Sequence, residues 1–167
     1  MALWYFTLFL FWHFFSGALS ETASSLVANQ SIITKVYFPR LILPISSVVT
    51  KFIDFLLAAV VLLVMMLYYG YTPYLSGLLI IPLLLIITFM ASSGLGMFLS
   101  ALNVKYRDVR YALPFFIQIL LFVTPVIYPA SIAGKYSWIL ALNPMTGVVQ
   151  TARAALLGAT PINWMLL

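Results

Sequence analysis

The chain has 167 residues, of which 65% are hydrophobic and only 7% are charged, whereas an ordinary soluble domain carries roughly 25% charged residues. This composition excludes a water-soluble globular protein. The net charge of +5 comes from Lys and Arg residues scattered at the ends of apolar blocks, so a nucleic-acid-binding patch is excluded as well. Cysteine is absent, which excludes a disulfide framework and Cys-based metal or redox chemistry.

Five apolar segments are predicted to be helical: residues 2–20, 41–69, 75–102, 111–128 and 138–159. Most are apolar on every side, as is typical of helices in lipid or in a bundle interior. A membrane span takes about 20 residues of helix, so the second and third segments are the strongest predicted spans. The fifth is interrupted by polar residues and Pro144, which predicts a short, broken, half-polar re-entrant helix on the outer side.

Basic residues are distributed unequally between the two predicted sides of the membrane. One side holds six basic residues: Lys35, Arg40, Lys51, Lys105, Arg107 and Arg110. The other side holds two: Lys135 and Arg153. The positive-inside rule therefore makes the first side cytoplasmic. Lys51 is expected about one turn inside its helix, beside Asp54 at i+3. Tyr68, Tyr69, Tyr71 and Tyr74 are expected to form an aromatic belt at the outer interface.

Both ends of the chain predict a fragment. Residue 1 falls on the outside with no basic flank to orient the first helix, and the chain stops in "PINWMLL", where a new apolar run begins. A signal peptide over residues 1–20 is disfavoured because it lacks a basic n-region.

A row of small and polar side chains follows the first apolar run on one broad helical face: His13, Ser16, Gly17, Ser20 and Ser24. Small residues let helices approach closely in lipid, so a packing face is one interpretation. The other is a face that lines a polar pathway, which Glu21 favours because an ionisable group at membrane depth needs water or a partner. In the third segment, Ser92, Gly96 and Ser100 repeat at four-residue spacing and predict close helix packing.

Two charged connections fall on the predicted cytoplasmic side. In "KVYFPRLILP", Pro39 disfavours helix before it and Pro44 fits the first turn of the next helix, giving a stiff elbow. The elbow is either a loop with positive-inside charge or a docking surface for a cytoplasmic partner. In "NVKYRDVRYALPFF", Asp108 suits a helix N-terminus and Pro114 fits a first turn. The basic residues there suggest interfacial anchoring, contact with lipid phosphates, or contact with a partner's acids; this interface comprises Lys105, Arg107, Asp108 and Arg110.

An aromatic stripe is predicted on the fourth segment, where Tyr111, Phe115, Gln118 and Phe122 share a helical face. It is either ordinary core and lipid contact or a stacking surface for sugar rings.

No catalytic motif is present in the sequence. There is no GxxxxGK[ST] phosphate loop, HExxH, G-x-S-x-G or suitably spaced pair of acids. We expect no ATP hydrolysis and no cofactor in this chain.

Three motifs resemble the permease subunits of ABC exporters of the second type, those that export O-antigen, capsule or teichoic acid polymers. They are "FFSGALSETASSLVANQSIITKVYFPR", "SALNVKYRDVRYALPFFIQILLFVTPVIYP" and "LNPMTGVVQTARAALLG", in the family's order and spacing. The resemblance implies an all-α polytopic membrane protein: a helical bundle of about four spans plus a re-entrant outer element at residues 130–157. Residues 1–167 would form one transmembrane permease domain that lacks the family's interfacial helix and first span, and its last span.

The resemblance also implies partners and roles. The permease would work as a homodimer in the bacterial cytoplasmic (inner) membrane, with ATP and Mg on a separate ATPase subunit. The cargo would be a lipid-linked glycan or polyol phosphate. The elbow would couple to the ATPase through Lys35, Tyr37, Phe38, Pro39 and Arg40, and the aromatic stripe would belong to the sugar path.

Two other classes remain open from the sequence. An ion-coupled carrier would place ionisable groups at mid-membrane, where His13, Glu21 and Asp54 are the candidates. A membrane enzyme handling lipid-linked sugars would need a cluster of acids or His near the interface, which the sequence does not contain.

Overall fold

The computed structural model describes residues 2–35, 37, 39–70, 75–106, 108–124 and 143–157. All regular structure in these ranges is α-helical, as the sequence predicted. The helices are α1 (Ala2–Ala28), α2 (Gln30–Lys35), α3 (Ile42–Tyr68), α4 (Leu75–Lys105), α5 (Val109–Val123) and α7 (Pro144–Leu157). Four predicted features lie outside the described residues: the last part of the fourth predicted segment, the first part of the fifth, Lys135, and the belt residues Tyr71 and Tyr74.

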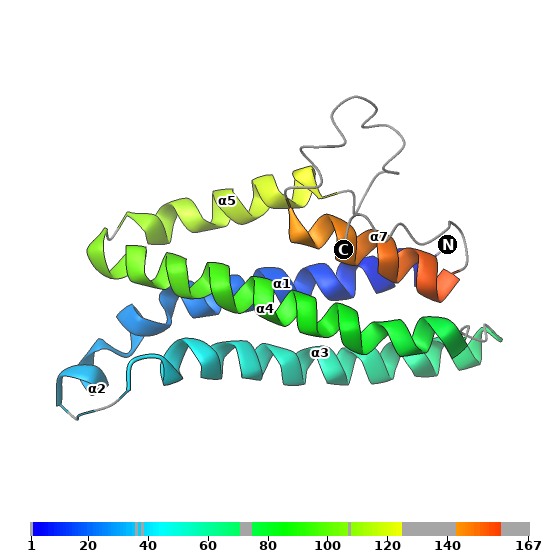
Figure 1. The fold of residues 1–167 in the computed structure, drawn as a ribbon, viewed down its shortest axis with the longest axis horizontal. Coiled ribbons are helices and arrows are strands. Elements are labelled where there is room, and N and C mark those ends of the chain that lie inside the picture. The colour runs from blue at the N-terminus through cyan, green and yellow to red at the C-terminus, as the bar shows by residue number, and fades with distance from the viewer. Residues whose placement is uncertain are drawn as a thin grey trace.

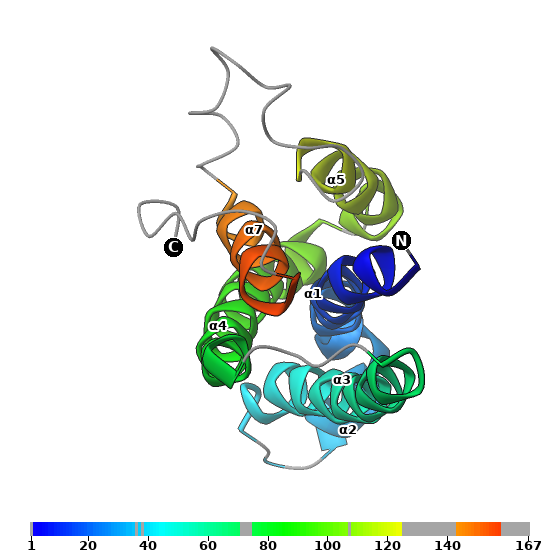
Figure 2. The same ribbon diagram turned by 90° about the vertical axis from the view of Figure 1, so that its right-hand side faces the viewer.

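Helix α1 is the centre of the bundle. It contacts α3, α4, α5 and α7, and the other helices surround it in the end-on view of Figure 2. Its 27 residues correspond to a length of about 40 Å. The long helices run roughly along one direction in Figure 1, with α2 and the start of α5 at one end and α7 at the other.

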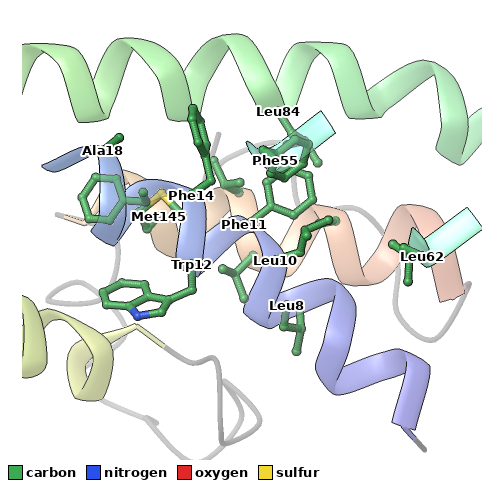
Figure 3. Packing of buried hydrophobic residues seen from close by; sticks show 14 of the residues in the cluster. Leu8, Leu10, Phe11, Trp12, Phe14, Ala18, Phe55, Leu62, Leu84 and Met145 are labelled. Atoms are coloured by element: carbon green, nitrogen blue, oxygen red, sulfur yellow. The ribbon is translucent and has the colours of Figure 1, made fainter. Parts of the chain in front are cut away.

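The core is formed where α1 meets α3, α4 and α7, as Figure 3 shows. Phe55 of α3 lies between two aromatic rings of α1, with ring centroids 5.2 Å from Phe11 and 5.5 Å from Phe14. Leu84 of α4 and Met145 of α7 are fully buried in the same cluster. Lipid tails are as apolar as these side chains, so close van der Waals packing is what stabilises the cluster.

Helices α1 and α4 approach closely along a line of small residues. A Cβ added to Gly96 would lie 2.7 Å from Cβ of Thr22, and the hydroxyl-bearing Ser92 and Ser100 are fully buried. One turn further, the buried side-chain amide of Asn103 donates a hydrogen bond to the carbonyl of Ala23 (3.0 Å). The packing predicted from the four-residue spacing is confirmed.

A hydrogen bond joins the end of α5 to the start of α7. The side-chain amide of Asn143 donates to the hydroxyl of Thr124, which ends α5 (2.8 Å). Its carbonyl oxygen accepts from the backbone N–H of Met145 (3.0 Å), so Asn143 also caps the start of α7.

Within the part of the chain that the structure describes, two helices are long and apolar enough to cross a membrane, α3 and the Ile80–Lys105 part of α4. Helix α7 has only 14 residues, which is about 21 Å and too short for a span. It was predicted to be broken, but it is continuous from Pro144 to Leu157 because its small and polar residues Thr146, Gly147 and Thr151 are buried in the bundle.

Three local expectations were wrong. Helix α4 continues to Lys105, because the amide of Asn103 is satisfied by α1 and does not begin a loop. Pro114 lies inside α5, which starts at Val109, so it is not in the first turn; Pro44, by contrast, does lie in the first turn of α3. Lys51 lies nine residues after Ile42, more than two turns into its helix, because its ammonium group has a partner there.

Gly94 and Gly96 of α4 test the α1–α4 contact directly. Gly96→Ala should destabilise the protein by about 1–3 kcal/mol because its methyl group would overlap Thr22, whereas Gly94 has nothing within 4 Å of an added Cβ. Gly94→Ala should be neutral or stabilising by up to about 1 kcal/mol from helix propensity. Thermal unfolding of the two variants in detergent is the measurement, and equal shifts in melting temperature would contradict the close contact.

Candidate functional site

The predicted elbow projects from the bundle at the end that carries the start of α5. Short helix α2 has no buried residue, and Lys35, Tyr37, Pro39 and Arg40 are all exposed; Phe38 lies outside the part of the chain that the structure describes. The carbonyl of Pro39 accepts a hydrogen bond from the N–H of Ile42 (3.1 Å), which closes the turn into α3. The chain thus presents a stiff basic and aromatic surface that its own described helices do not cover.

The second predicted interface, the turn between α4 and α5, lies at the same end (Figure 1). Lys105, Asp108 and Arg110 are exposed, and Arg107 is not among the described residues. The ammonium group of Lys105 lies 5.2 Å from the ring centroid of Tyr106. The carbonyl of Asp108 accepts the first hydrogen bonds of α5, but its side chain makes no capping bond.

Two hollows connect these surfaces, and both are lined by Val27, Gln30 and Asn103. One, of about 340 Å³, also has Arg110 and Tyr111 on its wall. The other, of about 380 Å³, has Arg40 on its wall. The sequence placed both arginines on one side of the membrane, but their positions around a shared wall depend on how α1, α4 and α5 pack.

The aromatic stripe of α5 points away from the bundle. Tyr111, Phe115 and Phe122 are respectively 75%, 71% and 62% exposed, and Gln118 between them is exposed too. Buried Leu113 lies on the other side of the helix. The four residues therefore share a face, as predicted, and that face is not core within the described chain.

A charged cluster joins α1 to α3. The ammonium nitrogen of Lys51 lies 2.6 Å from a carboxylate oxygen of Glu21 and 3.2 Å from one of Asp54. The methylenes of Lys51 pass over Gly17, where an added Cβ would be 3.3 Å from Cδ. The Lys51–Asp54 pair is confirmed, whereas the inter-helix pair with Glu21 was missed. The sequence signal for this inter-helix pair was an acid, Glu21, after one apolar segment and a base, Lys51, within the next.

Most of the polar row of α1 does not pack against the described helices; the exception is Gly17, which the methylenes of Lys51 in α3 contact. His13 and Ser20 are exposed, while Ser16, Gly17 and Ser24 are half-buried. The hydroxyls of Ser16 and Ser24 donate to carbonyls of their own helix. The main packed face of α1 is the one with Phe11, Ala18 and Thr22, so within the described residues the packing interpretation of this row holds only at Gly17.

The ABC-2 type transporter family matches residues 1–157, which is most of the chain. The chain belongs to the ABC-2 type transporter family. This membership agrees with the all-α fold, the membrane-length helices and the resemblance of the three sequence motifs, and it makes the chain a membrane protein.

Curated ABC-2 relatives include permeases of O-antigen export systems. The chain is 31% identical over 150 residues to the O-antigen export system permease protein RfbA of Klebsiella pneumoniae, covering 89% of this chain and 58% of the relative. It is 32% identical over 146 residues to the protein of the same name from Myxococcus xanthus, covering 86% and 56%. The chain thus spans somewhat more than half the length of these relatives.

The charged cluster can be tested by double-mutant cycles with neutral replacements of similar size. The Glu21→Gln and Lys51→Met cycle should give a coupling energy of about 0.5–2 kcal/mol, because the pair joins two helices. The matched cycle of Asp54→Asn with Lys51→Met should give less than about 0.5 kcal/mol, as for an i,i+3 pair within one helix. Unfolding free energies in detergent are the measurement; a Glu21–Lys51 coupling near zero would mean that the ion pair does not hold α1 to α3.

Proposed function

We propose that this chain is the membrane-spanning permease of an ATP-driven exporter that moves a lipid-linked polysaccharide or polyol phosphate across the bacterial cytoplasmic membrane. The relatives are named as permeases of O-antigen export, which supports a polysaccharide as the transported substrate. In this proposal the protein crosses the membrane several times, two copies form the path, and a separate ATPase subunit hydrolyses ATP with Mg.

The observation that carries the proposal is the exposed elbow between α2 and α3. Tyr37 is fully exposed, and α2 has no contact that buries a side chain. An aromatic and basic surface held in a turn is a suitable contact for a partner protein, since Tyr and Arg are enriched where interfaces are strongest. Because Pro39 and Pro44 restrict the backbone on both sides of Arg40, a movement of the partner would be passed to α3 rather than absorbed by the loop.

The transport path in this proposal uses the two uncovered faces near α1. The polar row of α1 offers hydroxyl and imidazole groups, and the stripe on α5 offers aromatic planes on which the C–H faces of sugar rings can pack. The polar row of α1 would be unfavourable as a lipid contact alone, because Ser20 and the neighbouring Glu21 are polar groups at membrane depth. A path between two copies would give these groups water and sugar as partners.

The charged cluster weighs against an ion-coupled carrier. Glu21 and Asp54 were the acids available for ion coupling, and both are within ion-pair distance of Lys51. A carboxylate that already holds the ammonium group of Lys51 is not open to a transported cation.

Coupling through the elbow can be tested by co-purifying the protein with the ATPase encoded beside it. Arg40→Ala and Pro39→Ala should leave the protein folded, since both residues are exposed, but should reduce ATP-driven export at least several-fold. Ser31→Ala, at an exposed position of α2 outside the elbow, is the control and should export normally. If no ATPase co-purifies with the unaltered protein, the exporter proposal fails.

The aromatic path can be tested on α5 with two residues of equal exposure. Phe122→Ala should lower polymer export about tenfold, because its ring, which is 62% exposed, would be lost from the proposed sugar path. Ile119→Ala, 61% exposed on the same helix, should leave export near normal. Surface polymer measured per molecule of permease distinguishes the cases, and equal loss in both variants would mean that the aromatic plane has no special role.

A further inference from the structure

We infer that the paired hollows between the elbow and α5 form a binding site for a phosphate group, with Arg40 and Arg110 as the anion-binding side chains. Neither the family nor the relatives' names assign this site. It stands on the geometry of the described residues and does not depend on the ATPase or on the proposed cargo.

The two arginines come from separate elements, but the hollows that they line share one wall. Arg40 lies in the turn before α3 and Arg110 in the first turn of α5. Their hollows, about 380 and 340 Å³, share Val27, Gln30 and Asn103. Gln30 contributes a side-chain amide that can donate to an anion, and Tyr111 contributes a phenol on the same side as Arg110.

The arginines are not neutralised within the part of the chain that the structure describes. The ion pairs found there both belong to Lys51, and Asp108 lines neither hollow. Two guanidinium groups on hollows that share a wall attract an anion, and their planar donor pairs match the oxygen geometry of phosphate better than a lysine would. The positive charges of Arg40 and Arg110 therefore favour the binding of an anion.

The remaining lining favours the phosphate of an amphiphile. The hollow beside Arg40 is walled largely by aliphatic groups from α1, α2 and α4, namely Leu26, Val27, Ile33, Ala101 and Val104. It lies at the end of α4, one of the helices long enough to span a membrane. A headgroup at this place would keep its phosphate on the arginines and its chain along the apolar wall. Free phosphate could contact the arginines in the same way, but it has no chain to lie along the apolar wall.

Binding can be measured with the protein in phosphatidylcholine nanodiscs, using empty nanodiscs to subtract partition into lipid. The probes are decyl phosphate, inorganic phosphate and decyl maltoside, which has the same chain and no charge. We expect saturable binding of decyl phosphate that Arg40→Gln and Arg110→Gln each weaken roughly tenfold or more. Lys105→Gln removes the same charge at the same end of the bundle but lines neither hollow, so it measures the general contribution of positive charge and should weaken binding much less than either arginine variant.

Each outcome has a distinct meaning. Arginine-dependent binding of decyl phosphate alone identifies a headgroup site, and equal arginine-dependent binding of inorganic phosphate identifies a site for the free anion. Unchanged melting temperatures, and partial recovery of affinity in Arg40→Lys and Arg110→Lys, would show that the loss is local. The site is overturned if decyl phosphate binds no better than decyl maltoside, or if Lys105→Gln weakens binding as much as the arginine variants.

Discussion

The contact on which the rest of the structure depends is the close approach of α1 and α4. Gly96 leaves room for the side chain of Thr22, and Asn103 reaches across to the backbone of α1. In lipid there is little hydrophobic force between helices, so such small-residue contacts and buried hydrogen bonds decide which helices associate. Because α1 is held against α4 on one side, its aromatic rings are presented to α3 and α7, and its polar row remains outside the core.

The cluster of Lys51, Glu21 and Asp54 fixes the second helix of this arrangement. Lys51 can reach Glu21 only because Gly17 has no side chain in the way. The ion pair sets the register of α3 along α1, and α3 begins at the elbow. The position of Arg40 relative to Gln30 and Asn103 therefore follows from contacts made well inside the bundle. A surface loop thereby gains a defined place beside the α4–α5 turn.

The helices themselves could be predicted from the sequence, because the apolar blocks and the Ser92, Gly96, Ser100 spacing are local signals. Contacts between segments were harder to predict from the sequence. Asn103 resembles a loop residue until its partner Ala23 is known, and Glu21 could have taken water as its partner instead of Lys51. The aromatic stripe was placed correctly on one face of α5, but which side that face occupies depends on the packing of Leu113. The shared wall between Arg40 and Arg110 has no local signal, since Val27 and Gln30 come from one stretch of the chain and Asn103 from another.

In the proposed transport path, the polar row of α1 faces water while the outer surface of α3 faces lipid. The chain contains no cysteine, so single cysteines can be introduced at Ser20 and Ser24, and at Leu57 and Val64, which are 65% and 61% exposed on α3. Labelling of these variants in membranes with a hydrophilic maleimide distinguishes the two environments. We expect rapid labelling at Ser20 and Ser24 and almost none at Leu57 and Val64; equal labelling of both pairs, or protection of the α1 pair alone, would contradict this arrangement.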